Sequence, residues 1–182
     1  MTDLKKHIKT RLNLEMAVTD FMIDFALTHR PAHCCFVPEK RQELTTEGGL
    51  DVCKNENAIQ KACEMLQNSH IDVSLFIEPK LEQIEAALRC GAKTIELHTG
   101  KYAEIKDESA KKAELEKIHY AVNFAHRKGL IVNAGHGLNY ENVNPIANIP
   151  AMNELNIGHS IVAKALTVGL FEAVKEMKEL IS

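Results

Sequence analysis

The fold is indicated first by Leu130-Ile131-Val132-Asn133-Ala134-Gly135-His136, in which an apolar run gives way to a glycine and a histidine. The same ending recurs at Asn156-Ile157-Gly158-His159. Two further runs, Thr94–His98 and Arg11–Glu15, also finish in ionisable side chains. Parallel-sheet enzymes gather their reactive groups where strands give way to loops. The four endings therefore predict one polar rim, which is the candidate active site.

Short apolar runs alternate with longer amphipathic ones along the chain, which is the pattern of βαβ units and a parallel sheet. The strand candidates are rich in Val, Ile, Leu and Phe, as strands covered on both faces are. They are Arg11–Glu15, His33–Val37, Asp72–Ile77, Thr94–His98, Leu130–Asn133 and Glu154–Ile157. A closed (β/α)8 barrel has eight such units. The sequence therefore predicts an α/β fold of six parallel strands with helices outside, which is two units short of a closed barrel.

Helix candidates lie between and around these strands. They are Asp3–Ile8, Thr19–Arg30, Ala58–Ser69, Leu81–Cys90, Ser109–Arg127 and Leu170–Ile181. In Ser109–Arg127 the apolar residues recur at helical spacing, and the following Lys128-Gly129 is typical of a helix C-terminus. The longest loops are expected at 38–51 and 100–108, and loops of that length are typical of lids or binding loops.

Length and composition narrow the class of protein. The 182 residues suffice for one sizeable core but not two, so we expect a single domain over residues 1–182. Hydrophobic residues at 45% and charged residues at 26% are ordinary for a globular protein, and the net charge of -3 gives no footprint for nucleic acid. Five cysteines without a C-x-x-C pair, and no apolar run approaching the roughly 18 residues of a membrane span, predict a reduced, cytoplasmic protein.

Two glutamates lie in apolar runs. Glu15 follows Leu12 and Leu14 near the expected mouth of the sheet, which suits a general base. The alternative is a structural carboxylate paired with a core Arg or Lys. Glu96 lies inside the strand Thr94–His98, where a glutamate is rare unless it is paired or functional. The residues alone leave both alternatives open.

Two histidines follow strands, His98 and His136. Imidazole titrates near neutral pH, so each is a candidate acid, base or phosphate contact, or else a hydrogen-bonded structural residue. At His136 the flanking glycines, Gly135 and Gly137, permit close approach of a ligand to the backbone. A functional role is therefore favoured at His136.

Gly158-His159-Ser160 leads directly into a short helix expected at Ile161–Ala165. The first amides of a helix are suited to phosphate, and barrels often hold phosphate in the loops after their last strands. These are the last strands of this chain. We therefore predict a phosphorylated substrate.

The loop from Glu39 to Gly49 mixes charges, hydroxyls and paired glycines. This composition suits a mobile lid, and the alternative is a solvated surface loop. Adjacent Cys34 and Cys35 would point to opposite faces of a strand, so both are expected in the core.

A metal site is the remaining alternative, because the rim offers carboxylates and imidazoles. The candidate ligands would be Glu15, Glu96, His98, His136 and His159. No H-x-H or H-E-x-x-H pattern occurs, and the histidines stand one per strand. A metal hydrolase is therefore disfavoured.

Seven phrases of the sequence together resemble the pyridoxine 5'-phosphate synthase family, the ring-closing enzymes of the deoxyxylulose-dependent vitamin B6 route. They are Asn13-Leu14-Glu15-Met16-Ala17, Val37-Pro38-Glu39-Lys40-Arg41-Gln42-Glu43, Thr45-Thr46-Glu47-Gly48-Gly49-Leu50-Asp51, Val73-Ser74-Leu75-Phe76-Ile77, Ile95-Glu96-Leu97-His98-Thr99-Gly100, Asn133-Ala134-Gly135-His136-Gly137-Leu138 and Glu154-Leu155-Asn156-Ile157-Gly158-His159. They run in family order through nearly the whole chain.

The resemblance implies a (β/α)8 barrel and a condensing transferase. Such an enzyme joins 1-deoxy-D-xylulose 5-phosphate to 3-amino-2-oxopropyl phosphate and releases phosphate and water. It also implies a homo-oligomer that needs no metal or organic cofactor. By motif, Glu15 resembles the family's general base, His136 its proton donor, and Glu96 the carboxylate that stabilises cationic intermediates.

The resemblance also assigns substrate contacts. Thr45 matches the lid threonine that contacts the deoxyxylulose phosphate. Gly137, Gly158 and His159 match positions that hold the amino-ketone phosphate. His98 belongs to a matching phrase but receives no role from it.

The front of the chain departs from the family pattern. The family begins with a strand ending in Asn-x-Asp-His and a second ending in His-x-Arg-Glu-Asp-x-Arg-His, and neither phrase occurs here. We therefore expect the 182 residues alone to bind phosphate weakly and not to turn over. The alternative to an active synthase is a non-catalytic fragment or remnant of one.

Overall fold

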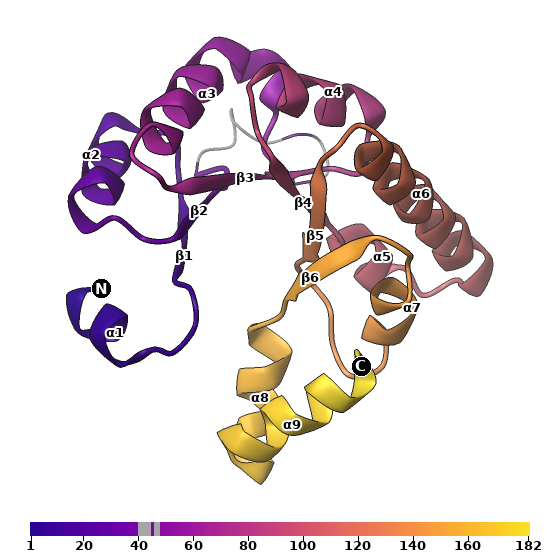
Figure 1. The fold of residues 1–182 in the computed structure, drawn as a ribbon. Coiled ribbons are helices and arrows are strands. Elements are labelled where there is room, and N and C mark those ends of the chain that lie inside the picture. The colour runs from indigo at the N-terminus through magenta and orange to yellow at the C-terminus, as the bar shows by residue number, and fades with distance from the viewer. Residues whose placement is uncertain (40–44, 46–47) are drawn as a thin grey trace. The chain divides into compact units, whose positions relative to one another are not determined.

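The computed structural model describes residues 1–39, 45 and 48–182, which divide into two compact units, Met1–Glu96 and Leu97–Ser182. The described residues form six strands, hydrogen-bonded in chain order from β1 to β6 (Figure 1). Strand β4 (Thr94–His98) begins in the first unit and ends in the second. The alternation predicted from the sequence is therefore present from β1 to β6.

The first unit contains β1 (Asn13–Met16), β2 (His33–Phe36), β3 (Asp72–Ile77) and the start of β4. Strands β1, β2 and β3 pair in parallel, with Glu15 opposite Cys35 and Cys35 opposite Ser74. The side chains of Cys34, Cys35 and Phe36 are fully buried. Burial of both neighbouring cysteines confirms the expectation that they belong to the core.

The helices of the first unit are α1 (Thr2–His7), α2 (Asp20–His29), α3 (Val52–Gln67) and α4 (Leu81–Arg89). Helices α2, α3 and α4 lie on the outer side of the strands of this unit (Figure 1). The Thr19 hydroxyl accepts a hydrogen bond from the Met22 amide and so caps the start of α2. At its end, the Lys5 ammonium donates to the carbonyl oxygens of His29 and Arg30, at 3.0 and 2.6 Å. Both ends of α2 therefore have partners for otherwise unpaired backbone groups.

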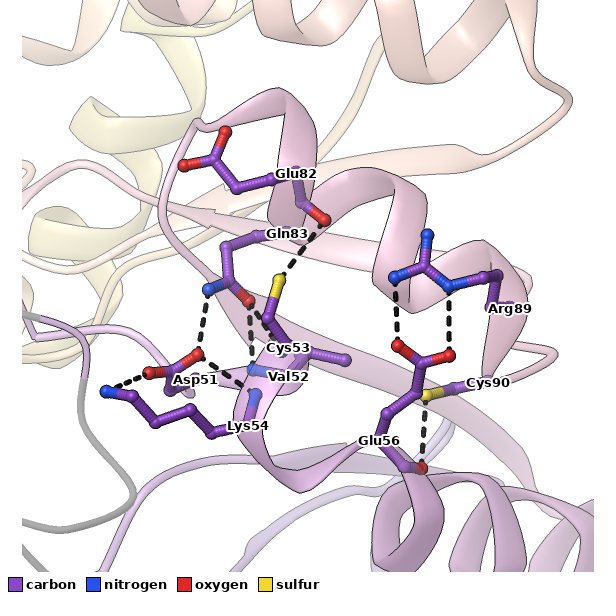
Figure 2. Close-up of polar contacts among 9 residues, drawn as sticks. All are labelled: Asp51, Val52, Cys53, Lys54, Glu56, Glu82, Gln83, Arg89 and Cys90. Atoms are coloured by element: carbon purple, nitrogen blue, oxygen red, sulfur yellow. Dashed lines mark hydrogen bonds and ion pairs between the residues drawn. The ribbon is translucent and has the colours of Figure 1, made fainter.

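Helix α3 is joined to α4 by a buried polar network (Figure 2). The Asp51 carboxylate caps α3 by accepting from the Lys54 amide, and it lies 2.7 Å from the Lys54 ammonium. Gln83 of α4 donates to Asp51 at 3.0 Å and accepts from the Val52 amide at 2.9 Å. Burial raises the pKa of Asp51, but the hydrogen bonds from Lys54 and Gln83 outweigh it and hold this pKa below its ordinary value. The network fixes the point at which the loop before α3 ends.

A second contact between these helices is the ion pair of Glu56 with Arg89 (Figure 2). The guanidinium donates to both carboxylate oxygens, at 2.9 and 2.8 Å. These hydrogen bonds lower the pKa of Glu56 and raise that of Arg89. Exposed ion pairs of this kind add little stability, so Gln83 is the more important link.

Replacing Gln83 by Ala is expected to lower the free energy of unfolding by about 1–3 kcal/mol, because the buried Asp51 oxygen and Val52 amide each lose a partner. Urea denaturation followed by circular dichroism would measure the change. Gln60→Ala is the matched control, since Gln60 is exposed on α3 and its side chain bonds only to Glu64 in the described network. Equal stabilities of the two variants would contradict the role given to Gln83.

The second unit contains the end of β4, β5 (Ile131–Gly135) and β6 (Met152–Asn156). Strands β5 and β6 are parallel, with Gly135 opposite Asn156. Its helices are α5 (Gly100–Glu104), α6 (Glu108–Arg127), α7 (Val143–Ala147), α8 (His159–Val168) and α9 (Leu170–Leu180). Helix α6 runs alongside β5 in Figure 1 and buries Ile118, Val122 and Ala125.

Three helix predictions were incomplete. Helix α3 begins at Val52, six residues before the expected Ala58, and Asn55 within it has non-helical torsion angles. Helix α5 occupies the start of the predicted loop 100–108, where the Tyr102 hydroxyl donates to the Asn142 carbonyl oxygen at 3.0 Å. Helix α7 was not predicted. Tertiary contacts hold these short segments, which carry too few apolar residues to show a period.

Candidate active site

The carboxylates predicted at the rim of the first unit are connected through a cysteine. Glu15 lies near the end of β1, where its side chain is exposed, and is paired in register with Cys35 of β2. Glu96 of β4 is only 5% exposed, and one of its carboxylate oxygens lies 3.6 Å from the Cys35 sulfur, which donates to it. The structure therefore brings Glu15, Cys35 and Glu96 to one face of the strands, since partners in register share a face.

The Cys35 thiol is held in its protonated form. Burial raises its pKa well above the ordinary value, and the charge of Glu96 raises it further. A protonated thiol is a weak hydrogen-bond donor, so it stabilises a carboxylate without competing for a proton. Cys35 is thus part of the surroundings of Glu96, a role that its expected place in the core did not reveal.

Of the four remaining cysteines, three are buried and one, Cys53, is exposed. Burial raises the pKa of Cys34 and Cys63 to about 12 and that of Cys90 to about 11. Partial burial and then the charge of Asp51 also raise the pKa of Cys53, so exposure is what distinguishes it from the four buried thiols. Only Cys53 is expected to react quickly with a thiol reagent near neutral pH, because a reagent can reach it without unfolding.

The pH dependence of stability follows from the same shifts. A thiol whose pKa is raised in the folded state contributes its full stability below the unfolded pKa, about 8.5, and loses it as pH rises through the folded value. We expect the free energy of unfolding to fall from about pH 9 to 12.

Ellman's reagent should count one fast thiol at about pH 7.5 and the other four after unfolding, with Cys53→Ser as the control lacking the fast one. Two or more fast thiols would contradict the assignment.

The end of the predicted lid is tightly placed. The Gly49 amide donates to the buried Glu78 carboxylate at 2.9 Å, and a Cβ at Gly49 would lie 2.7 Å from the Glu78 amide nitrogen. The Thr45 amide donates to the Gly49 carbonyl oxygen, and its hydroxyl accepts from Gly48. Lid residues 40–44, 46 and 47, which include Thr46, lie outside the described residues.

In the second unit, His98 and His136 contact each other. Their ring centroids are 4.8 Å apart. His98 is 8% exposed, while His136 is exposed at the end of β5. A Cβ at Gly100 would lie 2.6 Å from His98 Nε2 and 2.9 Å from His136 Cδ2, so a glycine is required for the two rings to pack as they do.

The predicted phosphate residues lie at the same edge of this unit. Gly137 has a φ of 81°, and a Cβ there would lie 2.6 Å from the Ala103 Cβ. Gly158 precedes α8 and His159 begins it, both exposed. The Ser160 hydroxyl donates to the Leu138 carbonyl oxygen at 2.9 Å, which attaches the start of α8 to the loop after β5. The expected short helix is thus α8, longer at both ends than predicted.

Cys35, Thr99 and Gly100 had no role predicted from the sequence. The alternation of side chains along a strand places Cys35 on the same face as His33. That Cys35 lies opposite Glu15 depends on how β1 and β2 pair, which the sequence does not give. Among the described residues, no three or more His, Cys, Asp or Glu side chains are grouped so as to hold a metal ion. In the same part of the chain, no helix is both long and apolar enough to span a membrane.

Comparison with known proteins places the chain in a family. Residues 1–182 match the family described as "Pyridoxal phosphate biosynthesis protein PdxJ". The chain belongs to the PdxJ family. Proteins named pyridoxine 5'-phosphate synthase are 54% identical in Legionella pneumophila and 55% identical in Photobacterium profundum. These matches cover 97% and 96% of this chain and 71% and 72% of the relatives. The PdxJ match confirms the resemblance inferred from the seven phrases.

Solved structures of low sequence identity share the fold. A 3-keto-L-gulonate-6-phosphate decarboxylase from Vibrio cholerae is 14% identical, with a TM-score of 0.65 over 99% of this chain and 76% of its own. KGPDC from Streptococcus mutans is 11% identical, with a TM-score of 0.64 over 97% of this chain and 74% of its own. The predicted α/β fold with six parallel strands, related to the (β/α)8 barrel, is confirmed.

Proposed function

We propose that this PdxJ-family chain is a pyridoxine 5'-phosphate synthase, which condenses 1-deoxy-D-xylulose 5-phosphate with 3-amino-2-oxopropyl phosphate. The observation that carries the proposal is the identity of 52–55% to relatives of that name over nearly the whole chain. The products are pyridoxine 5'-phosphate, phosphate and water. Residues 1–182 are proposed to act as a single domain, and the reaction to need no metal or organic cofactor.

Three residues are proposed to carry the proton transfers and charge stabilisation. Glu15 is the general base; its carboxylate is exposed and therefore accessible to a substrate. Glu96 stabilises cationic intermediates; its near-complete burial strengthens its interaction with a positive charge. His136 is the proton donor; its imidazole is exposed at the end of β5, and a histidine side chain can act as a general acid.

The phosphate groups are proposed to bind at backbone-rich positions. Gly137, Gly158 and His159 hold the amino-ketone phosphate, and α8 directs its first amides toward it. Thr45 contacts the deoxyxylulose phosphate. The support for Thr45 is its place in the family motif, and its hydroxyl accepts a hydrogen bond from the Gly48 amide.

The test compares this chain with two references. The first is the Legionella relative, and the second is this chain fused to the part of that relative that lies outside the match. Each is supplied with both substrates, and pyridoxine 5'-phosphate is measured by chromatography alongside released phosphate. Product from this chain itself supports the proposal. Product from the relative alone would contradict it.

A second candidate function is a non-catalytic form of the same protein. The chain spans 71–75% of the length of its relatives, and the assay above separates this candidate from the first. Turnover by the fusion without turnover by the 182 residues would support this candidate.

Further proposals concern the state of the protein. We expect phosphorylated small molecules as its ligands, no nucleic acid or membrane partner, a homo-oligomer and a cytoplasmic location. Light scattering after size-exclusion chromatography would measure the oligomer. Activity that survives EDTA would support a reaction without a divalent metal.

A further inference from the structure

Thr99 stands immediately after β4, at the N-cap of α5, and its side chain is fully buried. A threonine at an N-cap ordinarily accepts a hydrogen bond from an amide of the first helical turn. The Thr99 hydroxyl makes no such bond within the described chain. It lies instead 2.8 Å from the Gly135 carbonyl oxygen and 2.7 Å from that of His136. The hydroxyl is therefore directed at the loop that carries the candidate proton donor.

The Thr99 amide and hydroxyl are the two donors to the carbonyl oxygens of Gly135 and His136, and only one of these oxygens depends on the hydroxyl. The Thr99 amide already donates to the Gly135 carbonyl oxygen at 2.9 Å. A hydroxyl has one proton to donate. Loss of the hydroxyl would leave Gly135 with an amide donor, whereas His136 would lose the bond from Thr99. The hydroxyl therefore matters most for the His136 carbonyl.

The backbone at His136 needs such a partner. Its φ is 76°, in the left-handed region that residues with a Cβ rarely adopt, and Gly137 follows with a φ of 81°. Such conformations persist only where the surroundings enforce them, and they cluster at functional sites. The direction of the imidazole is set by this backbone, because the Cα–Cβ bond turns with φ.

Gly100, the residue after Thr99, lies close to the His136 ring. The rings of His98 and His136 occupy the room that a side chain at this position would need, since a Cβ at Gly100 would lie 2.6 and 2.9 Å from them. Thr99 thus contacts the His136 backbone while its neighbour contacts the His136 ring. Both contacts come from residues adjacent in sequence, at the junction of β4 and α5.

We propose that Thr99 is a positioning residue for His136. Its hydroxyl holds the His136 carbonyl and so fixes the left-handed backbone that aims the imidazole. Because Thr99 is fully buried, it acts through His136 and not on the substrate. The inference rests on the proposed role of His136 as proton donor.

The test uses two substitutions at Thr99 and one matched control, in whichever form of the protein turns over. Thr99→Val keeps the shape and removes the hydroxyl, while Thr99→Ser keeps the hydroxyl. Thr28→Val is the control, since the Thr28 hydroxyl donates to the Asp24 carbonyl oxygen at 2.8 Å on the exposed side of α2. We expect Thr99→Val to lower kcat by about 10-fold to 100-fold with little change in KM, because misplacement of a reacting group has effects of this size. Thr99→Ser and Thr28→Val should stay close to the wild type.

A second readout is independent of turnover. In the protein labelled with 13C,15N-histidine, the backbone resonances of His136 report its φ, and its ring resonances report its surroundings. Thr99→Val should shift or broaden both sets, and Thr99→Ser should leave them in place. If Thr99→Val does not fold, Thr99→Ala removes the same hydroxyl with less bulk.

The outcomes separate this inference from the proposed function. A lowered Tm in Thr99→Val, with unchanged kcat and unchanged His136 resonances, would show a purely structural role and overturn the inference. A His136→Asn variant that is as active as the wild type would instead overturn the role of His136. Altered His136 resonances together with a kcat effect restricted to Thr99→Val would support the inference.

Discussion

Replacing His136 by Asn is expected to lower kcat by about 100-fold to 10,000-fold, because an amide cannot donate the proton that the leaving group requires. Asn is the suitable substitute, since it tolerates a positive φ better than most residues and His136 has a φ of 76°. Folding should therefore be preserved. Steady-state kinetics in the form that turns over, with the Tm measured in parallel, would test this expectation.

The control for His136 is a histidine remote from the rim. His126 is exposed in the last turn of α6, and His126→Asn should leave kcat and Tm near the wild-type values. A third variant, His136→Gly, should be as inactive as His136→Asn and yet retain or gain stability, because glycine relieves a left-handed conformation. Comparable activity in His136→Asn and His126→Asn would contradict the assignment of the proton donor.

The strands could be predicted well because each is a compact apolar run with clear breaks. The predicted bounds of β3 and β4 agree with the structure residue for residue, Asp72–Ile77 and Thr94–His98. The start of α3 could not be predicted, since its first turn depends on the Asp51 cap and on Gln83 of α4. The periodicity of apolar residues along a segment does not reveal its contacts with distant segments.

The candidate site shows the same division. The sequence predicted Glu15, Glu96 and His136 from their places within or directly after apolar strands and from their residue types. The contact of Cys35 with Glu96 joins residues 61 apart in sequence and needed the sheet register. The role of Thr99 needed the direction of a hydroxyl, which a sequence motif does not give. Sequence therefore predicted the candidate reacting groups, and structure was required to find the groups that contact them.

Replacing Glu96 by Gln is expected to lower kcat by about 100-fold to 1,000-fold, the range seen when a preorganised electrostatic group is removed. The amide has the shape of the carboxylate but not its charge, and the Cys35 thiol retains an oxygen to which it donates. KM for either phosphorylated substrate should change little, because the phosphates are proposed to bind at other residues. The pKa of Cys35 should fall somewhat when the charge is lost, although burial, its larger cause, keeps the thiol protonated.

Stability separates a catalytic effect of Glu96 from unfolding. Glu96 is 5% exposed, and a buried carboxylate is costly to keep charged, so Glu96→Gln should have a Tm equal to or above that of the wild type. Glu116→Gln on the exposed face of α6 is the matched control and should leave kcat unchanged. Glu96→Asp should recover part of the activity, because it restores the charge at a shorter reach. A fully active Glu96→Gln would mean that the carboxylate serves the packing around Cys35 and not the reaction; a loss of kcat with an unchanged Tm would place the negative charge itself in the chemistry.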